Sequence, residues 1–127
     1  MIDSDFADLL ERLGLGTVGT DIFIGQLPAE TNGIYIVRVA GTMNNYLPTQ
    51  ETVIDVYVQN ISSSTAATKI ENVKNALHRH LETEIGTSHI FSILALGDIE
   101  DFGRDQDYGK MYKITIQVIH RSTTLIS

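Results

Sequence analysis

The chain has 127 residues, of which sixteen are acidic and nine are basic, so its formal net charge is −7. This charge opposes the neutralisation of phosphates, and it argues against general binding of DNA or RNA. The chain contains no cysteine, which excludes disulfides, thiolate zinc sites and thiol catalysis. A 43% hydrophobic and 20% charged composition predicts one globular domain over residues 1–127. With no signal-like start and no long apolar run, we expect an intracellular protein without a membrane span.

The first twenty residues predict a short helix and a linker. Apolar residues recur at helical spacing between Asp3 and Leu13, and Gly14 stands where a left-handed cap ends a helix. The letters of residues 14–19 match the dinucleotide fingerprint GxGxxG. That fingerprint needs a strand before it and a helix after it, whereas here the order is reversed. We therefore interpret the glycines as a helix stop followed by a linker.

Three strands are predicted next. Short apolar runs at residues 21–27 and 33–40 predict the first two, and turn-forming residues at 41–50 predict a long connection. The third strand has the clearest pattern, in which Ile54, Val56 and Val58 alternate with Asp55, Tyr57 and Gln59. Such alternation predicts one buried face and one face that meets solvent or a partner.

The second half predicts one long helix and two more strands. Serines and a threonine at 62–65 offer N-caps, and a stripe at spacings of three and four predicts a helix that ends near Gly86. The stripe consists of Ala66, Ile70, Val73, Leu77 and Leu81. The nearly all-apolar residues 90–96 predict a strand that is covered on both faces. Residues 98–109 predict a charged loop, and residues 110–121 predict the last strand.

The order α-β-β-β-α-β-β predicts an α+β fold. We expect a largely antiparallel sheet of about five strands, with the long helix packed on one face and a short N-terminal helix.

Residue patterns for chemistry are weak. Asp98, Glu100 and Gly103 occupy positions one, three and six of a calcium loop, but position twelve is Gly109 instead of glutamate. The four histidines have no metal-ligand spacing, and no nucleophile is paired with a base. We therefore expect no enzyme, no cofactor and no metal.

Apolar residues on predicted outer faces point to protein contact. Tyr57 faces away from the buried side of its strand, and Ile119 has the outer parity of the last strand. The 41–50 connection carries Met43 and Tyr46. Exposed apolar positions of this kind favour a protein–protein interface, unless the N-terminal helix covers that face.

Most of residues 5–121 resembles the minor capsid or tail-terminator proteins of long-tailed bacteriophages in order, spacing and residue type. The segments that carry the resemblance are 22–28 (IFIGQLP), 33–37 (GIYIV), Leu47-Pro48 leading into 53–58, 66–77, and Gly103-Arg104-Asp105 ahead of 112–116.

This resemblance implies a virion protein at the head–tail junction, present in the host cytoplasm during assembly. Its partners would be further copies in a hexameric ring, the tail tube protein and a head-completion or connector protein, with DNA passing through unbound. The expected tube contacts are Met43, Asn44, Asn45 and Tyr46. The expected subunit contacts are Tyr57, Arg104, Asp105 and Tyr108. Two alternatives stay open, a head-closure connector and a small bacterial regulatory or ligand-binding domain.

Overall fold

The computed structural model describes residues 2–25, 32–43, 50–78, 82–86, 88–105 and 109–122. The side chains of residues 3, 40–43, 104, 105 and 122 lie outside this description. In these ranges the elements are α1 (Ile2–Arg12), β1 (Ile22–Ile24), β2 (Gly33–Met43), β3 (Gln50–Asn60), α2 (Ser63–Leu77), β4 (Thr83–Ile85), β5 (Ser88–Ala95), β6 (Glu100–Asp105) and β7 (Gly109–Ser122).

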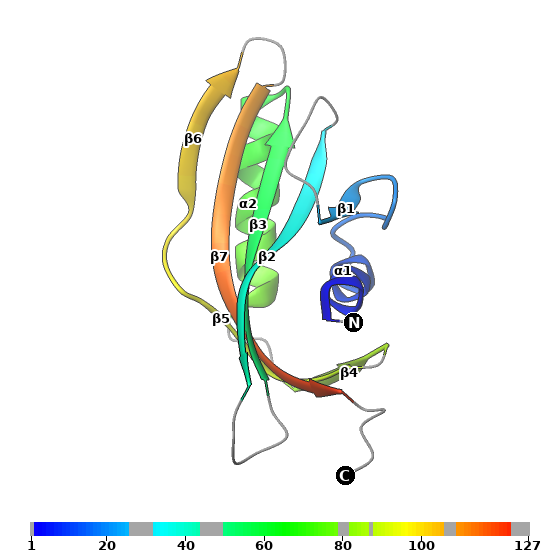
Figure 1. Ribbon diagram of the computed structural model, residues 1–127. Coiled ribbons are helices and arrows are strands. Elements are labelled where there is room, and N and C mark those ends of the chain that lie inside the picture. The colour runs from blue at the N-terminus through cyan, green and yellow to red at the C-terminus, as the bar shows by residue number, and fades with distance from the viewer. Residues whose placement is uncertain are drawn as a thin grey trace.

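All the described strands belong to one sheet in the order β1-β2-β3-β7-β5-β4. The β6 strand pairs with β7 beside its N-terminal part, and β5 pairs with the C-terminal part of the same strand. The β1 and β2 strands run parallel, and every other pair is antiparallel. The sheet is strongly curled along β2, β3 and β7 (Figure 1).

A glycine cap ends α1 at the predicted place. Gly14 has a positive φ of 80°. The N–H of Leu15 donates to the Leu10 carbonyl at 3.0 Å, and the N–H of Gly14 donates to the Glu11 carbonyl at 3.0 Å. These two bonds form a Schellman motif, which satisfies carbonyls that a helix end leaves free.

The second helix begins at a serine cap and buries the predicted stripe. Ser62 is extended, and its hydroxyl accepts from the N–H of Thr65 at 3.4 Å. The buried residues of α2 are Ala66, Ile70, Val73 and Leu77. The fifth predicted member, Leu81, lies outside the described residues.

Both helices pack on the same face of the sheet (Figure 1). Phe6, Leu9 and Leu10 of α1 share one buried cluster with the α2 stripe and with the inward residues of β2, β3, β5 and β7. We call this the inner face and the opposite side the outer face. The N-terminal helix therefore does not cover the face that carries Tyr57.

The structure confirms the α+β class and corrects several boundaries. The sheet has seven strands among the described residues instead of about five. The helix α2 ends at Leu77, well before Gly86, because residues 83–85 pair with β5 in a hairpin that turns at Gly86, where φ is 57°.

Two predicted loops are partly strand. Residues 41–43 continue β2, because a bulge between Arg38 and Ala40 restores pairing with β3. Residues 100–105 form β6 instead of a charged loop, because a bulge between Asp101 and Arg104 keeps them on the edge of β7. Charged residues are common on edge strands, where they discourage unwanted pairing.

Within the described residues, no helix is long and apolar enough to cross a membrane.

Candidate interaction surface

A row of aligned residues crosses the outer face of the sheet. The register places Phe23 opposite Tyr35, Tyr35 opposite Tyr57, Tyr57 opposite Lys113, and Lys113 opposite Glu100. One residue each from β1, β2, β3, β7 and β6 therefore forms this row, which we call the outer ladder. Directly opposed side chains on neighbouring strands contact one another, so the ladder is a continuous row of side-chain contacts across the outer face.

Aromatic rings pair at two places on the outer face, with Phe23 and Tyr35 stacked and Tyr57 tilted against Phe102 of β6. The rings of Phe23 and Tyr35 lie 5.1 Å apart at 28°, and the rings of Tyr57 and Phe102 lie 6.1 Å apart at 47°. Tyr35 is only 1% exposed, whereas Phe102 on β6 is 49% exposed. Offset aromatic pairs are rigid apolar platforms of the kind found at protein interfaces.

A network of charges anchors the β6 end of the ladder. The Lys113 ammonium lies 3.3 Å from Glu100 Oε2 and 3.8 Å from Asp55 Oδ2, and it sits 5.4 Å from the ring centre of Phe102. Desolvation lowers the pKa of Lys113, but the carboxylates of Asp55 and Glu100 outweigh it, so its pKa is raised overall. The Thr115 hydroxyl donates to Asp55 at 2.6 Å, which holds that carboxylate in place.

Acidic residues near β6 are paired within the chain. The Lys110 ammonium lies 2.7 Å from the Asp101 carboxylate, which also accepts the N–H of Gly103 at 2.7 Å, and these bonds lower the pKa of Asp101. Asp98 accepts the N–H of Ile99 at 2.7 Å and lies 3.1 Å from the Lys74 ammonium, which lowers its pKa likewise. These carboxylates are engaged in bonds that hold β6 to β7 and α2.

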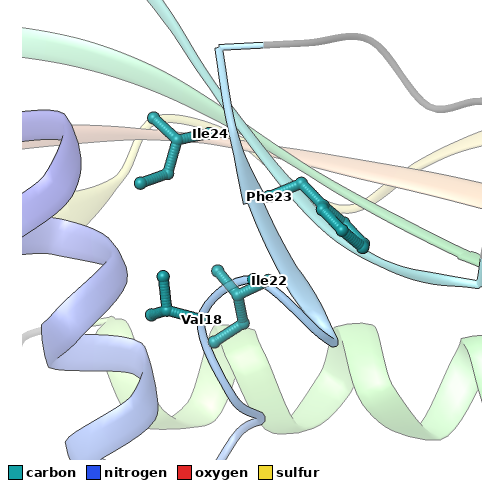
Figure 2. Close-up of a pocket in the computed structure, with 5 residues that line it drawn as sticks. Val18, Ile22, Phe23 and Ile24 are labelled. Carbon is teal, nitrogen blue, oxygen red and sulfur yellow. The ribbon is translucent and has the colours of Figure 1, made fainter.

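An apolar hollow lies at the opposite edge of the sheet, beside β1. It has a volume of about 190 Å³ and is lined by Val18, Gly19, Ile22, Phe23 and Ile24. Figure 2 shows Val18, Ile22 and Ile24 on the side of β1 that faces α1, with Phe23 pointing the other way. Ile22 is fully buried, whereas Ile24 is 37% exposed, so the hollow opens at the surface.

The structure reaches only part of the predicted contact set. Tyr57 is half-buried on the outer face, in the predicted orientation, and Ile119 shares that face opposite Glu51. Met43 ends β2, and Arg104 and Asp105 belong to β6, but their side chains are not described. Asn44, Asn45, Tyr46 and Tyr108 lie outside the described residues. Tyr57 and β6 come together through Phe102, a residue that the sequence analysis did not single out.

The sequence analysis also missed the carboxylates around His89. Its Nε2 lies 2.9 Å from Glu82 Oε1, and its Nδ1 lies 3.1 Å from Glu84 Oε1. The turn at Gly86 could have indicated this contact, because a hairpin that turns there places Glu84 opposite His89. The sequence analysis missed the contact because it assigned this segment to the long helix.

These features define a small α+β subunit with helices on one sheet face and an aromatic, charge-anchored surface on the other. In the part of the chain that the structure describes, no group of three His, Cys, Asp or Glu residues is placed to hold a metal ion.

The comparison with protein families identifies the class. The family model described as "Bacteriophage tail terminator protein" matches residues 9–122, so the chain belongs to the bacteriophage tail terminator family. It is accordingly a structural protein of phage tail assembly.

Two other comparisons add little. A chain of the virion of a native gene transfer agent particle is 15% identical, with 88% of this chain and 84% of that chain covered and a TM-score of 0.47. No curated protein sequence matches the chain.

Proposed function

We propose that the protein is the tail terminator of a long-tailed phage, which caps the tail tube, stops its polymerisation and joins the tail to the head. The observation that carries this proposal is the family match over residues 9–122. The protein acts in the virion at the head–tail junction, after assembly in the host cytoplasm, and it performs no chemical step.

The geometry supports a ring of identical copies, which we take to be six. One patch of a subunit then meets a different patch of the next, and the rotation closes. The candidates for such patches are the outer ladder and the sheet edges, where β1, β4 and β6 each pair with one described neighbour. Each copy brings a net charge of −7, so the ring lets DNA pass without binding it.

Purified tail tube protein tests the capping function. Tubes that polymerise with the terminator present should be shorter and should carry it at one end only, as seen by labelled electron microscopy. Tubes of unchanged length with no end-bound protein would refute the proposal. The head-closure alternative predicts capture by the portal complex and not by tubes, so a pull-down with both baits separates the two.

Tyr57 offers a test of the outer ladder as a contact surface. The Tyr57→Ala change removes the central aromatic ring and should raise the terminator concentration needed for half-maximal arrest of tube growth. Ile61→Ala is the matched control, because Ile61 is 55% exposed and lies outside the ladder. Equal arrest by the two variants would remove the ladder from the interface.

The contact of the 41–50 segment with the tube, through Met43, Asn44, Asn45 and Tyr46, stays a prediction. Substitution of these four residues should weaken binding to tube ends without changing the mass of the ring.

A further inference from the structure

His89 meets a carboxylate at each of its two ring nitrogens. Its Nε2 lies 2.9 Å from Glu82 Oε1, and its Nδ1 lies 3.1 Å from Glu84 Oε1. Only 16% of the His89 side chain is exposed, whereas both glutamate side chains are mostly exposed. The imidazole is therefore largely shielded from water, and both of its polar atoms face acids.

The two glutamates come from different parts of the β4 region. Glu84 is in β4 and lies opposite His89 in the hairpin register, whereas Glu82 precedes the strand, which begins at Thr83. The β4 strand has three residues, and β5 is its one partner among the described strands. A short edge strand has few backbone bonds, so it opens easily unless side chains hold it. His89 therefore ties both β4 and the segment that enters it to β5.

The other charged groups around this cluster, among the described residues, are two arginines. Arg121 on β7 lies opposite His89, and its guanidinium sits 5.9 Å from the ring centre of Phe91. The Phe91 ring lies 4.7 Å from the His89 ring. Arg12 of α1 donates to the Glu84 carbonyl at 3.0 Å, so it fixes the backbone of β4 and leaves the Glu84 carboxylate to the imidazole.

The protonation state of His89 determines how many of these bonds it can make. A protonated imidazole donates from both nitrogens, whereas a neutral imidazole has one donor and one lone pair. On loss of the proton, the lone pair of one nitrogen therefore faces a carboxylate, and that bond is lost. The hydrogen bonds to Glu82 and then to Glu84 raise the pKa of His89, although desolvation lowers it.

We propose that His89 is a pH-sensitive clamp on the β4 edge of the sheet, closed while the imidazole carries a proton and open once the proton is lost. The clamp goes beyond the proposed function, because it sets how firmly one edge of the sheet is held and it operates within a single chain.

Amide hydrogen exchange measured by NMR tests the clamp in the unmodified protein. After correction for the pH dependence of free amides, the protection of residues 83–85 should fall roughly two- to fivefold between about pH 6 and about pH 8.5, the size expected for the loss of an exposed ion pair. The protection of β3, an internal strand, should stay constant. Equal protection of residues 83–85 at the two pH values would overturn the clamp.

Two variants separate a clamp that depends on the proton from a bond that only supports the structure. His89→Asn should abolish the pH dependence, and Glu82→Gln should lower protection at pH 6 while moving the midpoint of the change toward lower pH. Glu71→Gln is the control, because Glu71 is an exposed residue of α2 outside the cluster. A pH dependence that survives in His89→Asn would overturn the clamp. These measurements use no tail tubes, so their outcome leaves the proposed function standing.

Discussion

Glu84 and His89 face each other across the β4–β5 hairpin, with 3.1 Å between Glu84 Oε1 and His89 Nδ1. Glu82 Oε1 lies 2.9 Å from the other ring nitrogen. Both nitrogens can donate to ionised carboxylates only when the imidazole is protonated. The hydrogen bond to Glu82, followed by that to Glu84, raises the pKa of His89.

We therefore expect His89 to titrate above its ordinary pKa of about 6.5 in an NMR titration. Glu82→Gln and Glu84→Gln should each bring its pKa back toward that value. The basic residues nearby are Arg121, opposite His89 on β7, and Arg12, which donates to the Glu84 carbonyl at 3.0 Å. A pKa at or below 6.5 in the unmodified protein would contradict the geometry.

The same bonds predict a pH-dependent stability. The pKa of His89 is raised in the folded state. Its contribution to the free energy of unfolding is therefore complete below about pH 6.5 and is lost as pH rises through the folded pKa of His89. The stability difference between the unmodified protein and His89→Asn should therefore shrink from pH 6 to pH 9. Denaturant unfolding at several pH values measures it, and a constant difference would count against the prediction.

His120 should behave in the opposite way. It is 3% exposed on the inner face, and its Nε2 lies 2.7 Å from the Thr52 hydroxyl. Burial lowers the pKa of His120, although the charge of Asp5 acts against this. The folded state therefore holds a neutral imidazole while the unfolded chain takes up a proton below about pH 6.5.

Stability should consequently fall as pH falls below 6.5 or so, with a slope of at most about 1.4 kcal/mol per pH unit from this group. His120→Gln should flatten that slope, and an NMR titration should give His120 of the folded protein a pKa below the ordinary value of about 6.5. A pKa of His120 at or above about 6.5 in the folded protein would contradict the burial argument.

Gly86 permits no side chain at the turn of the β4–β5 hairpin. Its φ is 57°, and an added Cβ would collide with the Asp5 carboxylate, which accepts from the Ser88 hydroxyl at 2.5 Å. A left-handed residue other than glycine costs about 1–2 kcal/mol before any collision. We expect Gly86→Ala to lower the free energy of unfolding by about 2 kcal/mol or more.

Gly97→Ala is the matched control for that measurement. A Cβ at Gly97 meets nothing within 4 Å, and its φ is not positive. Its effect should lie within about 1 kcal/mol of zero. Equal effects of the two substitutions, measured by urea unfolding, would show that the Asp5 contact does not constrain the turn.

Asp55 is the half-buried carboxylate of the outer face, with 13% of its side chain exposed beside Lys113. Because Asp55→Ala removes the acceptor of the Thr115 hydroxyl and a partner of Lys113, it should cost about 1.5–3 kcal/mol. Glu51→Ala is the control, since Glu51 is exposed and its contact with Gln117 is long, at 3.4 Å. Thermal and urea unfolding compare them, and similar losses would contradict the prediction.

The local spacing of apolar residues was enough to predict α1, the stripe of α2 and the inward face of β3. Leu9 and Leu10 follow Phe6 by three and four residues, which places all three on one face of a helix. Ile54, Val56 and Val58 occupy every second position of one strand. Such periodicities are set by the backbone geometry of each element, so they can be recognised without knowing its neighbours. The outward orientation of Tyr57 follows from the same alternation.

Only the tertiary structure decided that residues 83–85 and 100–105 are strands, since their short, charged sequences become strand by pairing with β5 and β7. It also decided that Phe102 covers Tyr57 and that two glutamates enclose His89. Tyr57 and Phe102 come together because β6 lies beside β7 and β7 beside β3. Strand order and register bring such residues together, and neither is written in the spacing of a single segment.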